Sequence, residues 1–266
     1  MINALTIDLE DWRQSTFNNE APITERVVEN TKKILDIFAE TNTKATFFCL
    51  GLVAEKYPQL IKDIHNQGHE ISTHGWSHGS VKEMGADKFK QELTGSIRIL
   101  EDICGVKVLG HRAPNFSIDL ETEWAFEIIA ELGLIYDSSL FPIKGKRYGS
   151  PECSLKSFHI NKNLVEIPLT ALDFGGRRWP VLGGGYFRLY PYLLSSYFLR
   201  KINRDGRPAV VYIHPHEVDT QDLKKGDIPY KIRFHQGLFR YRIAARLKKL
   251  LSDFKFDSIQ KVFKFQ

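Results

Sequence analysis

The sequence predicts an α/β protein built on a parallel sheet, either a barrel or a doubly wound sheet. Helical stretches alternate with short apolar runs about four times within residues 1–140. A glycine precedes most of these runs, where a helix C-terminus favours a residue that tolerates positive φ. Polar residues follow each run, as they do at the carboxyl edge of parallel strands in α/β enzymes.

The individual elements follow from hydrophobic periodicity. A strand pattern begins at once in residues 1–10, and glycines at positions 68, 105 and 133 separate three helix–strand pairs. The expected helices span residues 24–40, 53–66, 87–104 and 120–132, and the expected strands span residues 45–50, 69–74, 106–111, 134–138 and 209–213. Residues 238–254 have helical periodicity with Arg and Lys between the apolar positions. We interpret them as a basic amphipathic helix that packs on the sheet, with a membrane surface as the alternative contact.

Length and composition favour one soluble domain over residues 1–266. Hydrophobic residues make up 42% and charged residues 26% of the chain, which excludes a disordered tail, a collagen-like fibre and a coiled-coil rod. The formal net charge of +5 is too small to indicate nucleic-acid binding.

Cysteine usage favours a reducing compartment. Cys49, Cys104 and Cys153 are odd in number and widely spaced, so a disulfide framework or a cysteine zinc site is not expected. The first residues lack the basic and apolar regions of a signal peptide, and no segment is apolar enough to cross a membrane. We therefore expect a cytoplasmic protein.

The first group of candidate catalytic residues is a cluster of three carboxylates directly after an apolar run. Asp8 and Glu10 share one face of a strand, and Asp11 joins them only if the strand ends there. Three acids at a sheet terminus favour a cationic partner. The alternative interpretation is a solvated acidic turn.

The second group is a pair of histidines four residues apart. His74 and His78 would lie roughly 13 Å apart on a continuous strand, so they reach one ion only from a tight turn. Gly75, Ser77 and Gly79 permit such a turn. This spacing is common among zinc ligands, although surface histidines also occur in pairs by chance. Two histidines and one carboxylate with an open position form a hydrolytic metal site.

Two further polar residues also follow apolar runs. Arg112 is a permanent cation, and Pro114 keeps the residue before it out of the helical region, so this loop could direct the guanidinium at the acids. His214 ends the run 209–213 and is a candidate general acid at the same edge of the sheet. Without these neighbours, Arg112 would be a surface cation and His214 a packing residue.

These motifs resemble those of the polysaccharide deacetylases of carbohydrate esterase family four. The motifs occur in family order at residues 6–11 (TIDLED), 74–78 (HGWSH), 112–116 (RAPNF) and 212–214 (YIH). Residues 68–78, 132–139, 183–188 and 214–219 are similar to the branch associated with exopolysaccharide and surface-glycan biosynthesis. The resemblance covers about residues 5–259 and implies a distorted (β/α) barrel that removes an N-acetyl group from an acetamido sugar.

The resemblance also implies roles for individual residues. An Asp together with His74 and His78 would hold one divalent ion. Zn²⁺ is the expected ion, and Co²⁺, Mn²⁺ and Ni²⁺ are the alternatives. Arg112 would tether the catalytic base, and His214 would be the general acid. The family motif Thr-Phe-Asp-Asp-Gly has two adjacent acids, whereas this chain has Asp8, Glu10 and Asp11 followed by a tryptophan. We favour Asp11 as the ligand and Asp8 as the base, with Glu10 as the next candidate for the base.

Substrate contacts are expected from residues in or near the later motifs. They are Pro114, Phe116, Tyr186 and Trp179, of which Trp179 is only an approximate match to the family's tryptophan motif. The expected partner is a glycan or a lipid-linked sugar, with no nucleic acid and with peripheral contact at the inner membrane face as a further expectation. The alternatives are a hydrolase of cyclic amides such as ureides, and an inactive member that binds glycan.

Overall fold

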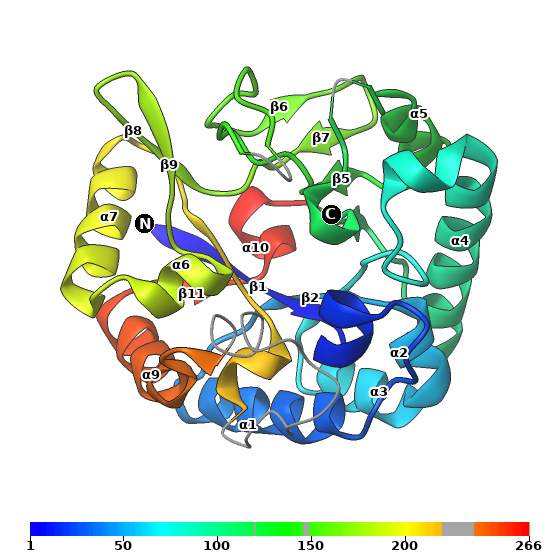
Figure 1. The fold of residues 1–266 in the computed structure, drawn as a ribbon, viewed down its shortest axis with the longest axis horizontal. Coiled ribbons are helices and arrows are strands. Elements are labelled where there is room, and N and C mark those ends of the chain that lie inside the picture. Colours follow the sequence, from blue (N-terminus) through cyan, green and yellow to red (C-terminus); the bar gives the residue numbers. More distant parts are fainter. Residues whose placement is uncertain (120, 146–148, 220–236, 266) are drawn as a thin grey trace.

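The structure, a computed structural model, describes residues 1–119, 121–145, 149–219 and 237–265. A curled sheet lies inside a ring of helices (Figure 1). Its strands are β1 (Ile2–Leu9), β2 (Thr46–Cys49), β3 (Glu70–Thr73), β4 (Gly110–His111), β5 (Tyr136–Asp137), β6 (Phe158–His159), β7 (Val165–Glu166), β10 (Val210–Ile213) and β11 (Lys255–Asp257). A separate hairpin consists of β8 (Ala171–Phe174) and β9 (Arg177–Pro180).

The helices lie around this sheet, except that the last of them crosses one end of the barrel. They are α1 (Arg26–Glu40), α2 (Gly51–Lys56), α3 (Pro58–Asn66), α4 (Val81–Cys104), α5 (Trp124–Glu131), α6 (Gly184–Leu189), α7 (Tyr192–Arg204), α9 (Ile243–Asp253) and α10 (Ile259–Phe263). Short helical turns are η1 (Arg13–Phe17), η2 (Pro114–Phe116), η3 (Pro215–Val218) and η4 (Arg240–Arg242). The expected helix 53–66 is divided because Pro58 starts a new helix after the extended Tyr57. Gly105 adopts positive φ where α4 ends, as its position predicts.

The strand order is β10-β1-β2-β3-β4-β5-β7-β6, and all neighbours are parallel except β6 and β7. Within the described residues, β6 and β10 do not pair, so the barrel is open on one side. The Thr170 side chain bridges this side by bonding the backbone N–H and C=O of Val210. The prediction of an α/β fold with a distorted parallel barrel is therefore confirmed.

The C-terminal segment closes the end of the barrel at which the parallel strands begin. β11 pairs with the beginning of β1, and α10 follows it across the barrel (Figure 1). The buried Glu70 carboxylate accepts hydrogen bonds from Thr46, Tyr136 and the backbone of Gln260. Burial raises the pKa of Glu70, so this end of the barrel is a structural closure rather than an exposed acidic site.

The basic helix predicted over residues 238–254 corresponds to η4 and α9. Ile243, Leu247, Leu250 and Leu251 are buried, so its apolar face packs on the core as expected. Among the described residues, no helix combines the length and the apolar character needed to cross a membrane.

Candidate active site

The parallel strands bring the predicted polar residues to one edge of the sheet. Asp8 is the penultimate residue of β1, His74 follows β3, Arg112 follows β4 and His214 follows β10. Asp8, His74 and His214 line a pocket of about 340 Å³, and Arg112 contacts Asp8. The pocket is lined by Asp8, Glu10, Ser15, Thr16, His74, His78, Asn115, Phe116, Gly184, Gly185, Tyr186, Arg188, Leu189, Tyr212, His214, His216 and Glu217.

Glu10, His74 and His78 form a group able to hold a metal ion. One carboxylate oxygen and one ring nitrogen from each histidine lie within 4.8 Å of one another, and all three residues are buried. His78 Nε2 is 2.7 Å and His74 Nε2 is 3.7 Å from Glu10 Oε2. Two imidazole nitrogens and one carboxylate oxygen form a ligand set that suits Zn²⁺ and other divalent first-row transition metals.

The backbone conformation explains how the two histidines converge. His78 has a φ of 64°, so the chain turns back on itself after Gly75 instead of continuing as a strand. The Nδ1–H of His74 donates to the carbonyl of Arg112 at 2.7 Å. This bond orients the ring so that Nε2 faces Glu10, as is usual for ligand histidines.

Glu10 is held as a carboxylate in this buried position. Burial opposes its ionisation, but the charges of His78 and His214 and hydrogen bonds from His74 and His78 keep the pKa of Glu10 well below its ordinary value. Its second oxygen, Oε1, accepts a hydrogen bond from the Ser15 hydroxyl at 2.9 Å. One oxygen therefore faces the histidines while the other is fixed by η1.

The prediction that Asp11 is the third metal ligand is wrong. Its Oδ1 accepts from the backbone N–H groups of Arg13 and Gln14, and its Oδ2 accepts from both donors of Thr24. Asp11 therefore caps the turn that begins η1, and both of its oxygens are used. Glu10 occupies the position that we had assigned to Asp11, because the strand ends with Leu9 and the longer side chain reaches the histidines.

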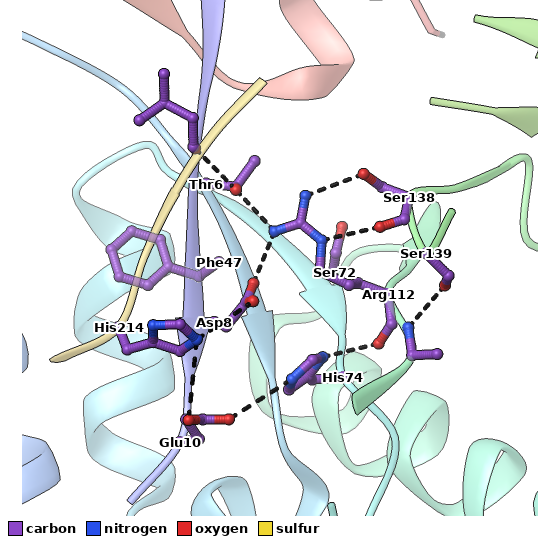
Figure 2. A network of polar contacts seen from close by, with 12 residues as sticks. Thr6, Asp8, Glu10, Phe47, Ser72, His74, Arg112, Ser138, Ser139 and His214 are labelled. Atoms are coloured by element: carbon purple, nitrogen blue, oxygen red, sulfur yellow. Dashed lines mark hydrogen bonds and ion pairs between the residues drawn. The ribbon is translucent and has the colours of Figure 1, made fainter. Parts of the chain in front are cut away.

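Asp8 lies beside this group in an ion pair with Arg112. Asp8 Oδ1 accepts from Arg112 Nη1 at 2.7 Å, and both side chains are buried (Figure 2). The guanidinium also lies 4.1 Å from the centre of the Phe48 ring. The predicted tether between Arg112 and an acid of the first motif is present, and the acid is Asp8.

Two further residues fix the guanidinium in place. Arg112 donates to the Thr6 hydroxyl at 2.7 Å and to the Ser138 hydroxyl and carbonyl at 2.9 and 3.0 Å (Figure 2). Each of the three guanidinium nitrogens therefore donates a hydrogen bond, and Asp8 Oδ1 is held in one orientation. The motifs that contain Thr6 and Ser138 do not predict a role for either residue, because hydrogen bonds between distant segments leave no local pattern in the sequence.

His214 lies beside the two acids. Its Nε2 is 3.8 Å from Asp8 Oδ2 and 4.0 Å from Glu10 Oε1 (Figure 2). Its Nδ1 is 3.6 Å from Glu217 Oε2. Burial lowers the pKa of His214, but Glu10, Glu217 and Asp8 together raise it to about 9. The structure thus favours an imidazolium at neutral pH. The sequence analysis missed the role of Glu217 in this arrangement.

His216 stacks on His214 and has the opposite protonation preference. The ring centroids are 5.0 Å apart, and burial together with the charge of His214 holds the pKa of His216 well below its ordinary value. A neutral ring beside an imidazolium is a packing surface rather than a second acid.

The four predicted substrate contacts divide into two pairs. Phe116 and Tyr186 line the pocket. Pro114 is buried and does not line the pocket, and its ring lies against Gly75. Trp179 is 49% exposed on β9, opposite Leu172 in the hairpin, and is also absent from the lining. Pro114 and Trp179 thus lie outside this pocket, because η2 and the hairpin direct them elsewhere, and their contact with substrate stays a prediction.

Two family models match consecutive parts of the chain. Residues 14–135 match "Polysaccharide deacetylase", and residues 138–264 match "Domain of unknown function (DUF3473)". The Peptidoglycan-N-acetylglucosamine deacetylase of Bacillus cereus is 37% identical over 101 residues, which cover 38% of this chain and 37% of that protein. Chitin deacetylase 1 of Cryptococcus neoformans is 30% identical over 104 residues, which cover 39% of this chain and 22% of that protein. The chain thus spans 37% and 22% of the length of these two curated relatives.

Solved structures confirm the barrel. A Mycobacterium smegmatis protein assigned to the polysaccharide deacetylases aligns with a TM-score of 0.64 and 19% identity over 98% of this chain and 90% of that one. An allantoinase aligns with a TM-score of 0.62 and 16% identity over 98% and 88%. At these identities the likeness concerns the fold alone.

The chain therefore carries a polysaccharide deacetylase family domain in residues 14–135, followed by a DUF3473 domain in residues 138–264. This confirms the resemblance drawn from the motifs. The candidate site draws on both parts, because His74, His78 and Arg112 lie in the first match and His214 lies in the second. Asp8 and Glu10 precede both matches.

The capping role of Asp11 leads to the first prediction. We expect Asp11→Asn to lower the free energy of unfolding by about 1–3 kcal/mol, because the amide replaces one acceptor oxygen by a donor that faces N–H groups. Metal content per chain should stay unchanged. Denaturant unfolding and metal analysis of the purified variant check both parts. Loss of metal at unchanged stability would restore Asp11 as a ligand.

Proposed function

We propose that this protein is a metal-dependent carbohydrate N-deacetylase that hydrolyses the acetamido group of a sugar in a polysaccharide or a lipid-linked glycan precursor. The observation that carries the proposal is the convergence of Glu10, His74 and His78 with the Asp8–Arg112 pair and His214 around one pocket. The named activities of the curated relatives support the same reaction type.

The three buried donors would hold one divalent ion, which we propose to be Zn²⁺, with Co²⁺, Mn²⁺ and Ni²⁺ as alternatives. Such an ion acts as a Lewis acid that polarises a carbonyl and acidifies water. Two of the proposed ligands are each anchored by a further hydrogen bond. Glu10 accepts from the Ser15 hydroxyl, and His74 donates to the carbonyl of Arg112. Such anchoring preorganises a metal site.

The remaining residues, Asp8 and His214, supply acid–base chemistry from neighbouring positions in the pocket. Asp8 is the proposed base that takes a proton from the attacking water, and Arg112 fixes its second oxygen. His214 is the proposed acid that gives a proton to the leaving nitrogen, since an amine leaves readily only when protonated. Glu217 and the two acids of the first motif favour the protonated form of His214. His214 thus begins the reaction in the protonated state that its step requires.

The test combines metal analysis with acetate release. We expect about one divalent ion per chain and release of acetate from N-acetylated oligosaccharides. Both should be lost in the His74→Ala, His78→Ala double variant, because two of three ligands are removed. Opening of a cyclic ureide without acetate release would favour the cyclic-amide alternative. Bound metal with no turnover of either class would favour the inactive, glycan-binding alternative.

We also propose that the protein acts in the cytoplasm, on the basis of its cysteine usage. Cys49, Cys104 and Cys153 are free thiols in the structure. Fractionation of the native host should recover the protein in the cytoplasm or at the inner face of the membrane. Recovery from the periplasm or the medium would contradict this location.

A further inference from the structure

Exposed apolar side chains are concentrated on one part of the molecule. Six of the ten large hydrophobic side chains that the described residues expose fall within residues 174–197. Leu189, Leu193, Leu194 and Tyr197 lie at the corner where α6 meets α7, and Leu193 is 81% exposed. We call these four residues the α6–α7 corner. Soluble proteins seldom gather exposed leucines in this way without a partner surface.

The α6–α7 corner adjoins the mouth of the active-site pocket. Leu189 lines the pocket and is also 46% exposed. Leu193 and Tyr197 follow on the outer side of α7, one helical turn apart, in the turns nearest to the pocket. A surface that contacts this corner would therefore lie directly beside bound substrate.

The segment of chain that carries the corner is basic, although the Asp253 carboxylate of α9 accepts a hydrogen bond from the neighbouring Tyr192 hydroxyl. Residues 174–204 contain six Arg and Lys residues and no Asp or Glu, so this segment has a net charge of +6, whereas the whole chain has +5. Arg200 and Arg204 continue the exposed line of α7 that begins with Leu193 and Tyr197. The remainder of the chain has a net charge of −1, so residues 174–204 account for the net positive charge of the protein.

The β8–β9 hairpin extends the same outer side of the molecule. It projects from the ring next to α7 (Figure 1), and the Tyr190 hydroxyl bonds the carbonyl of Pro180 at the end of β9. Phe174 and Trp179 are exposed on one face of this hairpin. Trp and Tyr side chains are typical of membrane–water interfaces, where cations nearby bind lipid headgroups.

We propose that the α6–α7 corner is a membrane-contact surface that binds an anionic phospholipid bilayer and holds the pocket mouth beside it. Leucines that enter the bilayer would account for the exposed apolar side chains of this segment, and attraction of its arginines to anionic headgroups would account for its positive charge. A second copy of the chain fits less well, because a symmetric contact would bring two such positive segments together. The membrane-contact surface rests on the proposed function in one respect. A lipid-linked sugar substrate would lie at the membrane, so a pocket mouth held beside the bilayer could reach it.

The basic helix α9, which the sequence offered as a membrane contact, is engaged elsewhere. Lys248 pairs with Glu40 at 2.6 Å and Lys249 with Asp253 at 3.1 Å. Arg246 donates to three carbonyls around the end of α6. The helix thus supports the corner rather than presenting an apolar face of its own.

The test is sedimentation with vesicles of phosphatidylcholine alone and of phosphatidylcholine with phosphatidylglycerol. We expect the full chain to bind the anionic vesicles at low salt and to be released by added salt. Leu193→Ser with Tyr197→Ser should weaken binding about tenfold at both low and moderate salt. Arg200→Gln with Arg204→Gln should weaken it severalfold at low salt and little at high salt.

The matched control is Val106→Ser. Val106 is 46% exposed, but it precedes β4 and so lies at the opposite edge of the barrel, where loss of an apolar side chain should not change vesicle binding. The unfolding midpoint and acetate release from a soluble oligosaccharide should remain normal in the Leu193, Tyr197 variant, since neither residue lines the pocket.

Three outcomes would overturn the membrane surface. They are no vesicle binding by the wild type, an equal loss in the Val106 control, and conversion of a wild-type dimer to a monomer by the Leu193, Tyr197 substitutions. Normal vesicle binding without acetate release would instead refute the proposed function and leave this surface in place.

Discussion

Asp8→Asn is expected to lower kcat about 10²–10⁴-fold while leaving about one metal ion bound per chain. The amide keeps the size of the side chain, and its oxygen still accepts from Arg112 Nη1, so the pocket keeps its shape. The carboxylate that takes the proton is lost. Glu10, His74 and His78 are untouched, so metal binding should persist. Steady-state kinetics and metal analysis of the same preparation check this result.

Glu10→Gln is the matched comparison, because it lies two residues away and also removes one charge. We expect this variant to lose metal as well as turnover, since the amide removes the negative ligand that faces both histidines. Metal loss in Asp8→Asn, or a metal-replete but inactive Glu10→Gln, would exchange the roles of these two acids.

The fold could be predicted from the sequence because its signals are local. The apolar periodicity of α1 and the glycine that ends α4 depend on neighbouring residues only. The order of these elements then restricts the sheet to a parallel arrangement. Pro58 also carried a local signal, yet the expected helix 53–66 ran through it. The open side of the barrel depends on a contact between Thr170 and Val210, which no local pattern records.

The site was predicted less completely, for a physical reason. Strand alternation placed Asp8 and Glu10 on one face, which the structure confirms, but the spelling of the motif favoured Asp11 as the ligand. Whether Asp11 faces the histidines depends on where β1 ends and on Thr24, which caps its carboxylate from 13 residues away. Choosing among three adjacent acids therefore required the tertiary structure.

His214→Ala is expected to lower kcat about 10²–10⁴-fold with little change in metal content or substrate KM. The imidazole lies beside Asp8 and Glu10 in the pocket, and the surrounding carboxylates raise its pKa to about 9, so it is available as a proton donor at neutral pH. Its loss should matter most when the leaving nitrogen needs protonation. If attack and breakdown of the intermediate both limit the rate, the effect should shrink for a trifluoroacetamide, whose addition intermediate forms more readily.

His216→Ala is the control that separates a proton donor from a packing residue. His216 stacks on His214 and lines the pocket, but burial and the neighbouring charge keep its ring neutral, so it has no proton to give at neutral pH. We expect this substitution to be much milder than His214→Ala. Its effect should be similar for acetamide and trifluoroacetamide substrates, because it changes the support of His214 rather than the proton itself. Equal losses in the two variants, or full activity in His214→Ala, would show that another group protonates the leaving amine.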